Sequence, residues 1–217
     1  MALLVKICGI NSPESADAVV RAGADLAGLV FHPGSPRHLT FEAGGSLSGR
    51  MRGRVRLVAL MVDAGDETIA QVLKVVKPDF LQLHGKETPA RAAAVRARFG
   101  VPLIKAIAVA DAADLSIVPC YEQSCAMFLF DAKAPDGSRP GGRGAPFDWQ
   151  LLRGRSFSRP WLLAGGLTPE NVTRAVATAK APGVDVSSGV ETTPGVKSAE
   201  LIAAFVSAAR NEMEARA

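Results

Sequence analysis

Short apolar runs recur along the chain at fairly regular intervals. They are rich in β-branched residues and are bounded by glycine, proline or polar residues, as buried parallel strands are. Eight such runs predict strands at Leu3–Cys8, Leu26–Phe31, Leu57–Val62, Phe80–His84, Leu103–Val109, Met127–Asp131, Trp161–Gly165 and Val184–Ser187.

Amphipathic segments separate these runs. The first helix is expected to begin after Ser12 as N-cap and to end at Gly23, and Thr88-Pro89 is a typical start of another. The expected helices are Pro13–Ala22, Glu67–Val76, Thr88–Gly100, Asp111–Gln123, Phe147–Leu152, Thr168–Lys180 and Lys197–Arg216. Strand–helix repetition without a linker predicts one α/β domain over residues 1–217, a (β/α)₈ TIM barrel, with an open doubly wound sheet as the alternative.

The segment after the second strand does not fit the helical pattern well. Between Phe41 and Arg54 the chain carries Gly44, Gly45 and two further glycines. Each interior glycine costs a helix about 0.5–1 kcal/mol relative to alanine. A short, mobile second helix is therefore predicted here.

Composition narrows the class of protein. Of the 217 residues, 48% are hydrophobic and 21% are charged, which is typical of a globular protein. The net charge is +4, but the densest basic cluster, Arg50 to Arg56, carries no interleaved aromatics and is interpreted as a solvated turn, so no nucleic-acid partner is expected. Three cysteines without framework spacing, and no run of membrane length, favour the cytoplasm and no membrane partner.

Two residues with proton-transfer chemistry end apolar runs. Cys8 closes the first predicted strand before Gly9, and Asp131 closes the sixth before a loop. In a parallel barrel both would lie at the carboxyl ends of strands, where such folds place their active sites. A thiol and a carboxyl group facing one another suggest a base and an acid.

Further polar residues interrupt the strands. By strand periodicity Lys6 shares a face with Cys8, Gln82 with His84, and Asp185 with Ser187, while Lys105 lies within the fifth strand. One interpretation is a polar lining beneath a ligand site. The other is a self-satisfied buried ion pair such as Lys6–Asp185.

Six motifs, in order from Lys6 to about Phe205, resemble those of the phosphoribosylanthranilate isomerase family of tryptophan biosynthesis. They are VKICGI (5–10), VFHPGSPR (30–37), LQLHG (81–85), FD…GGRGAPFDW (130–149), LAGGLTPENV (163–172) and VDVSSGVE (184–191). The resemblance implies a cofactor-independent, metal-independent isomerase acting on a phosphosugar. Its reaction is the Amadori rearrangement of N-(5-phosphoribosyl)anthranilate to 1-(2-carboxyphenylamino)-1-deoxyribulose 5-phosphate.

The resemblance also implies catalytic roles. Asp131 would protonate the ribose ring oxygen, for which it must hold a proton at neutral pH. Cys8 would then act as the base, and a nearby cation would favour its thiolate.

Binding roles are implied as well. Arg37 would bind the anthranilate carboxylate, because its planar guanidinium suits a carboxylate. Asp185 is expected to line the substrate site, and His84 either lines it or is a satisfied rim residue. The phosphate is expected at the ends of the seventh and eighth strands and on a glycine-rich loop, with Gly142, Gly165, Gly166, Ser187, Ser188 and Gly189 as its contacts. Arg143 departs from the family's usual threonine or serine, so its own contact stays open.

Two other classes compete with the isomerase. One is a different phosphosugar barrel enzyme, such as an epimerase or a sugar-phosphate lyase. Many metal-dependent epimerases need paired histidine and aspartate ligands on strands, whereas only His84 ends a strand here. A non-catalytic phosphate-binding barrel would leave Cys8, Asp131 and Arg37 together unexplained. We expect a monomer whose partner is the small-molecule substrate.

Overall fold

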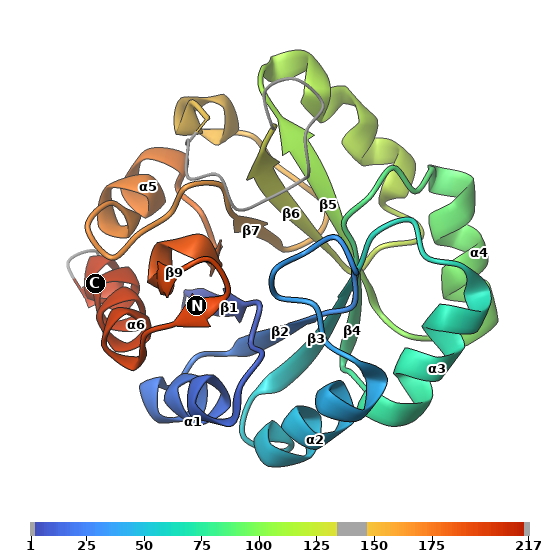
Figure 1. Ribbon diagram of the computed structural model, residues 1–217. Helices are drawn as coiled ribbons and strands as arrows, with labels where there is room; N and C mark the ends of the chain where they lie inside the picture. The colour runs from blue at the N-terminus through green and yellow to red at the C-terminus, as the bar shows by residue number, and fades with distance from the viewer. Residues whose placement is uncertain (1–2, 134–146, 215–217) are drawn as a thin grey trace.

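Eight parallel strands close into a barrel in chain order (Figure 1). The predicted TIM barrel is therefore confirmed, and the alternative of an open doubly wound sheet is excluded. The computed structural model describes residues 3–133 and 147–214. The barrel strands are β1 Leu4–Cys8, β2 Leu26–Val30, β3 Arg56–Met61, β4 Phe80–Leu83, β5 Leu103–Val109, β6 Met127–Ala132, β7 Trp161–Leu163 and β8 Gly183–Val186. Each overlaps one of the predicted runs.

Helices surround the barrel as an outer layer (Figure 1). They are α1 Pro13–Ala22, α2 Phe41–Met51, α3 Asp66–Val76, α4 Pro89–Phe99, α5 Val172–Ala179 and α6 Ala199–Glu214, together with the 3₁₀ helices η1 Ala112–Tyr121, η3 Trp149–Leu152 and η4 Ser188–Val190. A small antiparallel hairpin, β9 Glu191–Thr193 and β10 Val196–Lys197, follows η4. None of the helices in the described ranges has both the length and the apolar character needed to cross a bilayer.

The predicted capping residues define several helix ends. Ser12 and Ser15 form a capping box at the start of α1, and Gly23 ends that helix in the left-handed conformation. Thr88 caps α4, Pro89 occupies its first turn, and Gly100 ends it. These local signals explain why α1 and α4 begin and end where the sequence predicted.

The prediction of a short second helix is wrong. The helix α2 runs over 11 residues, as long as α3 and α4, and Thr40 caps it. Its glycines allow close packing: a Cβ on Gly44 would lie 2.5 Å from a ring carbon of Phe31, and one on Gly45 would lie 2.6 Å from Val75. Contact with β2 and α3 offsets the intrinsic cost of glycine in the helix. The predicted mobility of this segment remains a prediction.

Three other segments after the barrel strands also differ from the predicted helices. The segment after β5 forms a 3₁₀ helix with Pro119 inside it. The helix α5 begins only at Val172, because the Asn171 side chain accepts a hydrogen bond from the backbone N–H of Thr168 and holds the preceding residues in a turn. Lys197, expected to start the last helix, belongs instead to β10.

Alternate residues of each strand face two separate cores. Inside the barrel a compact cluster is built by Leu26, Val58, Ile104, Met127, Leu129, Leu162 and Ala164. The larger core lies between the strands and the helices, and it includes Val5 and Ile7 of β1. Lys6 and Cys8 therefore point into the barrel.

Candidate active site

A cavity lies at the carboxyl ends of the strands, and its empty space, including the part open to solvent, is about 700 Å³. Its walls contain most of the predicted site residues, namely Cys8, Arg37, His84, Asp131, Gly165, Gly166, Asp185, Ser187 and Ser188. Residues from β1, β4, β6 and β8 thus meet at one rim, as parallel strands of a barrel require.

Cys8 lies at the end of β1 and is buried at the cavity wall. Gly28 on β2 makes room for it, since a Cβ at that position would lie 2.7 Å from the Cys8 sulfur. Burial raises the pKa of the Cys8 thiol, although the ammonium groups of Lys6 and Lys197 oppose the rise. In the unliganded protein Cys8 is therefore a thiol, and the ammonium groups of Lys6 and Lys197 are close enough to stabilise its thiolate.

Asp131, near the end of β6, faces His84, the residue directly after β4. The Nε2 atom of His84 lies 3.4 Å from Asp131 Oδ2, and the amide of Gln82 is 2.8 Å from His84 Nδ1. In the tautomer whose Nδ1 accepts from the Gln82 amide nitrogen, the ring proton is on Nε2, the nitrogen that faces Asp131. His84 therefore lines the cavity in contact with the candidate acid.

The loop after β7 passes close to Asp131. Gly165 has a φ of +85°, and a Cβ on it would lie 3.1 Å from Asp131 Oδ1 and 2.6 Å from the backbone nitrogen of Ala132. That nitrogen donates a 2.9 Å hydrogen bond to Asp131 Oδ1. Glycine is thus required for the approach of this loop to the carboxyl group.

Lys6 and Asp185 form a buried ion pair inside the barrel, with Nζ 2.8 Å from Oδ1. Burial lowers the pKa of Lys6, but Asp185 and Cys8 outweigh it, so that its net pKa is raised and the ammonium is retained. Asp185 also lines the cavity. The pair is therefore satisfied, as one interpretation predicted, and its Asp185 side also lines the cavity, as the other predicted.

Lys105 does not belong to this lining. Its strand neighbours Ile104 and Ala106 point into the barrel, so Lys105 points outward, beneath the helices. There it binds Glu87 at 2.9 Å and the backbone carbonyls of Gly85 and Leu83. Of the two interpretations left open by the sequence, the buried ion pair therefore describes Lys105, because its side chain lies on the outer face of the strand.

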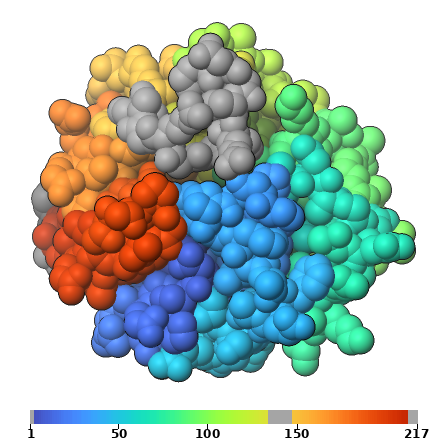
Figure 2. Space-filling view, viewed as in Figure 1, coloured from blue at the N-terminus to red at the C-terminus, as the bar shows by residue number. Residues whose placement is uncertain are grey.

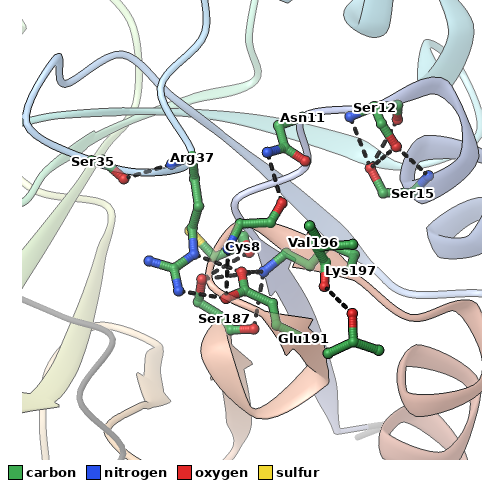
Figure 3. A network of polar contacts seen from close by, with 12 residues as sticks. Cys8, Asn11, Ser12, Ser15, Ser35, Arg37, Ser187, Glu191, Val196 and Lys197 are labelled. Atoms are coloured by element: carbon green, nitrogen blue, oxygen red, sulfur yellow. Dashed lines mark hydrogen bonds and ion pairs between the residues drawn. The ribbon is translucent and has the colours of Figure 1, made fainter.

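Arg37 reaches the cavity from the loop after β2, but two of its nitrogens are already engaged. Its Nε and Nη2 atoms lie 2.6 and 2.7 Å from the two carboxylate oxygens of Glu191 (Figure 3). The aliphatic part of Arg37 crosses Gly9, where a Cβ would lie 2.5 Å from the Arg37 Cδ.

The sequence did not identify Glu191 or Lys197 as site residues. The Lys197 side chain is fully buried, and its ammonium lies 2.7 Å from Glu191 and 2.9 Å from the carbonyl of Ser187. The turn signal Thr193-Pro194-Gly195 between two short extended stretches could have predicted the hairpin that brings them together. On the face shown in Figure 2, this orange-red hairpin and the light-blue loop that carries Arg37 lie side by side.

The loops after β7 and β8 form the part of the cavity where the sequence predicts the substrate phosphate to bind. Gly166, like Gly165, has a positive φ, and Ser188 begins η4. Gly189 is not among the residues that line the cavity. An added side chain there would clash with the Leu167 carbonyl. Gly142 and Arg143 lie outside the described residues.

An apolar wall completes the cavity. Val30 of β2, Leu60 of β3 and the adjacent Val62 cluster beside Cys8. A planar aromatic group bound between this wall and Arg37 would bury its ring against aliphatic side chains. Among the described residues, no group of three or more His, Cys, Asp or Glu is placed to hold a metal ion.

A closed (β/α)₈ barrel with a thiol, a carboxyl group and an arginine around one cavity at its carboxyl-end rim belongs to the class of TIM-barrel enzymes. The comparisons with known proteins are more specific. Residues 5–208 match the N-(5'phosphoribosyl)anthranilate (PRA) isomerase family. The chain belongs to this family.

Individual relatives are similar in sequence over nearly the whole length of the chain. An N-(5'-phosphoribosyl)anthranilate isomerase of Rhodopseudomonas palustris is 48% identical, with 99% of both chains covered. One from Azorhizobium caulinodans is 51% identical, over 97% of this chain and 92% of the relative.

Solved structures are similar too. The phosphoribosyl anthranilate isomerase of Thermotoga maritima has a TM-score of 0.86 at 36% identity, covering 96% of this chain and 99% of that one. A phosphoribosyl anthranilate isomerase in complex with reduced 1-(o-carboxyphenylamino)-1-deoxyribulose 5-phosphate has a TM-score of 0.82 at 33% identity, with the same coverage.

Proposed function

We propose that this chain is a phosphoribosylanthranilate isomerase of tryptophan biosynthesis. It converts N-(5-phosphoribosyl)anthranilate to 1-(2-carboxyphenylamino)-1-deoxyribulose 5-phosphate. Family membership over nearly the whole chain supports this activity. The reaction is an isomerisation, so its balance requires neither an oxidant nor a group carrier.

Asp131 is the proposed acid. It gives a proton to the ribose ring oxygen, the bond between that oxygen and C1 breaks, and the anilino nitrogen forms a cationic imine with C1. The His84 Nε2–H beside Asp131 then stabilises the carboxylate that remains. A positioned acid of this kind contributes about 10²–10⁴-fold in rate.

Cys8 is the proposed base. The cationic imine acidifies C2, and the Cys8 thiolate removes the C2 proton to give an enolamine. The 2-hydroxyl then loses a proton while C1 gains one, which yields the ketone with the overall formula unchanged. Lys6 and Lys197 oppose the effect of burial on the Cys8 pKa, and so favour the thiolate that this step needs.

The remaining cavity residues are proposed to hold the substrate. Arg37 binds the anthranilate carboxylate, with the ring against the apolar wall of Val30, Leu60 and Val62. His84 and Asp185 contact the sugar. The phosphate is held by the loops after β7 and β8 and by the glycine-rich loop, through Gly142, Gly165, Gly166, Ser187, Ser188 and Gly189.

The observation that carries these roles is that Cys8, Asp131 and Arg37 line one cavity. Replacing Cys8→Ser or Asp131→Asn should lower kcat by about 10²-fold or more while the protein stays folded. Chromatographic separation of substrate and product measures the rate, and circular dichroism checks the fold. Cys120→Ser is a matched control, since Cys120 is exposed and lies outside the cavity.

Full activity in both the Cys8→Ser and Asp131→Asn variants would overturn the assignment of base and acid. The activity itself is tested separately, by growth without tryptophan of a strain that lacks this isomerase. Failure of the wild-type chain to restore growth, together with no turnover in vitro, would overturn the function.

We further propose that the chain acts as a monomer in the cytoplasm, with the phosphosugar as its only partner. All three cysteines are free thiols, which suits a reducing compartment. Light scattering across a range of concentrations tests the monomer, and a mass of twice the chain's 22.6 kDa would contradict it.

A further inference from the structure

The hairpin β9–β10 places an ionic cluster of Arg37, Glu191 and Lys197 beside the cavity. The proposed chemistry uses Arg37 and Lys197 but gives no role to Glu191. Glu191 accepts four hydrogen bonds: Arg37 Nε and Lys197 Nζ bind one oxygen, while Arg37 Nη2 and the backbone nitrogen of Gly195 bind the other (Figure 3). A carboxylate whose two oxygens each accept two hydrogen bonds is held in one orientation.

The cluster carries one surplus positive charge. Arg37 and Lys197 are two basic groups against the single carboxylate of Glu191, and all three side chains are at most 11% exposed. Burial lowers the pKa of Lys197, and the carboxylate of Glu191, 2.7 Å from its ammonium, opposes that fall. Burial raises the pKa of Glu191, but Arg37 and Lys197 outweigh it, so the net pKa is lowered and Glu191 stays ionised. A buried surplus cation favours binding of an anion from the cavity side.

The geometry also fixes which edge of Arg37 is available. Glu191 takes the edge formed by Nε and Nη2, so Nη1 points away from Glu191 and makes no hydrogen bond with any described residue (Figure 3). The backbone nitrogen of Arg37 donates to Ser35 Oγ, and its aliphatic stem lies over Gly9. The outer edge, Nη1 with the second hydrogen of Nη2, is therefore the part of Arg37 that can meet a ligand.

The hairpin itself is fastened to the barrel at several points. Asn11 donates to the carbonyl of Gly195 at 2.9 Å, Lys197 donates to the carbonyl of Ser187, and Ser187 Oγ donates to the carbonyl of Cys8. Arg37 is thus positioned from the same strand end that carries Cys8.

We propose that Glu191 is a positioning residue that presents the outer edge of Arg37 to the ring carboxylate of the substrate, and so sets the enzyme's preference for a carboxylated aromatic amine. Lys197 holds Glu191 in place. The inference rests on the proposed function, since it names how that substrate's carboxylate is selected.

The test compares two substrates that differ only in the carboxylate, N-(5-phosphoribosyl)anthranilate and N-(5-phosphoribosyl)aniline. Glutamine can offer only one acceptor oxygen to the two N–H groups of Arg37, and its amide would face the other. In Glu191→Gln, kcat/KM for the anthranilate compound should fall by about 10- to 100-fold, the scale of a lost charged hydrogen bond, mostly through KM. For the aniline compound it should stay within about twofold.

Asp17→Asn provides the matched control. Asp17 forms the same bidentate pair with Arg50, at 2.7 and 2.6 Å, on the helix layer away from the cavity. This variant should leave the kcat/KM ratio of the two substrates unchanged. In an Arg37→Lys background, Glu191→Gln should cause no further loss on the anthranilate compound, because the planar group that Glu191 orients is gone.

A fall of equal size on both substrates in Glu191→Gln would reduce Glu191 to a structural role and overturn the proposal, as would no fall on either. Should that variant fail to fold, Glu191→Asp keeps the charge with a shorter side chain, and it must show the same selective loss in smaller measure. Wild-type protein inactive on both compounds would instead overturn the proposed function, a result distinct from an active enzyme without the selective loss.

Discussion

Lys6 and Lys105 each stand in the middle of an apolar strand, and each is buried against a carboxylate. Lys6 binds Asp185 inside the barrel, at the floor of the cavity, whereas Lys105 binds Glu87 in the layer between strands and helices. Both lysines also lie near a buried cysteine, Cys8 in the first case and Cys125 in the second.

The two pairs differ in what surrounds them. Lys105 is fully enclosed: it binds Glu87 and two backbone carbonyls, and its ammonium lies 5.9 Å from the centre of the Tyr121 ring. Glu87 in turn accepts hydrogen bonds from the backbone nitrogens of Asp63 and Gly85, so this pair ties β5 to the loops after β3 and β4. The Lys6–Asp185 pair is satisfied too, yet Asp185 remains open to the cavity. The face of the strand, rather than residue type or burial, separates a structural pair from one available to a ligand.

Breaking the interior pair should have the largest effect. Asp185→Asn removes the counter-ion of Lys6 and the anion at the cavity floor. We expect a loss of about 3–5 kcal/mol in the free energy of unfolding, as for other broken buried pairs. We also expect a fall of roughly 100-fold in kcat/KM, the scale of one charged hydrogen bond. Urea unfolding and steady-state kinetics measure the two. A variant with wild-type kinetics would make this pair as structural as that of Lys105.

Breaking the outer pair should change stability alone. Lys105→Met leaves the buried Glu87 without its cation, again at a cost of about 3–5 kcal/mol in unfolding free energy. The folded fraction should keep kcat/KM within about threefold of wild type, because no contact with the transition state is removed. The same urea titration and kinetics apply. A large kinetic defect in protein shown to be folded would contradict the distinction drawn between the two faces.

The smallest expected effect is a difference in alkylation rate between the two buried thiols, Cys8 and Cys125. Burial raises the pKa of both, that of Cys125 to about 11, with the nearby lysine opposing the rise in each case. Because the raised pKa keeps Cys8 protonated near neutral pH, its alkylation by iodoacetamide should be slow there. Its rate should still be rising at pH values above about 8.5, where a free thiol is half ionised. Cys125, which does not line the cavity, should stay unmodified in the native protein.

Mass spectrometry of the labelled peptides follows both cysteines at once, and Cys8→Ser identifies the cavity signal. Exposed Cys120 serves as an internal reference for reagent quality. Labelling of Cys125 at the rate of Cys8 would show that the outer pair is not enclosed.

The sequence predicted the barrel well because its strands are short, apolar and bounded by turn residues. Cys8 and Asp131 could be placed at the cavity because each ends such a run. Lys105 could not be placed, since β5 is apolar on both faces and periodicity alone does not say which residues point inward. The length of α2 was underestimated because the benefit of Gly44 and Gly45 comes from tertiary contacts with Phe31 and Val75.

Glu191 and Lys197 were missed for a different reason. Both lie in a hairpin whose strands are only three and two residues long, too short for alternation to be recognised. Their partner Arg37 is 154 residues away from Glu191 in the chain, and no local pattern reports such a pairing. The sequence still identified Arg37 itself, through its resemblance to the family motif.

The apolar wall beside Cys8 has a practical consequence for protein engineering. Val30 ends β2, Leu60 lies in β3 and Val62 follows that strand, and the three side chains are apolar. A saturation library at these three positions could reshape the apolar wall for a larger or differently substituted arylamine. The proposed proton-transfer groups, Cys8 and Asp131, would be left unchanged. Gly9 should stay constant in any such library, because even one added methyl group there would collide with the stem of Arg37.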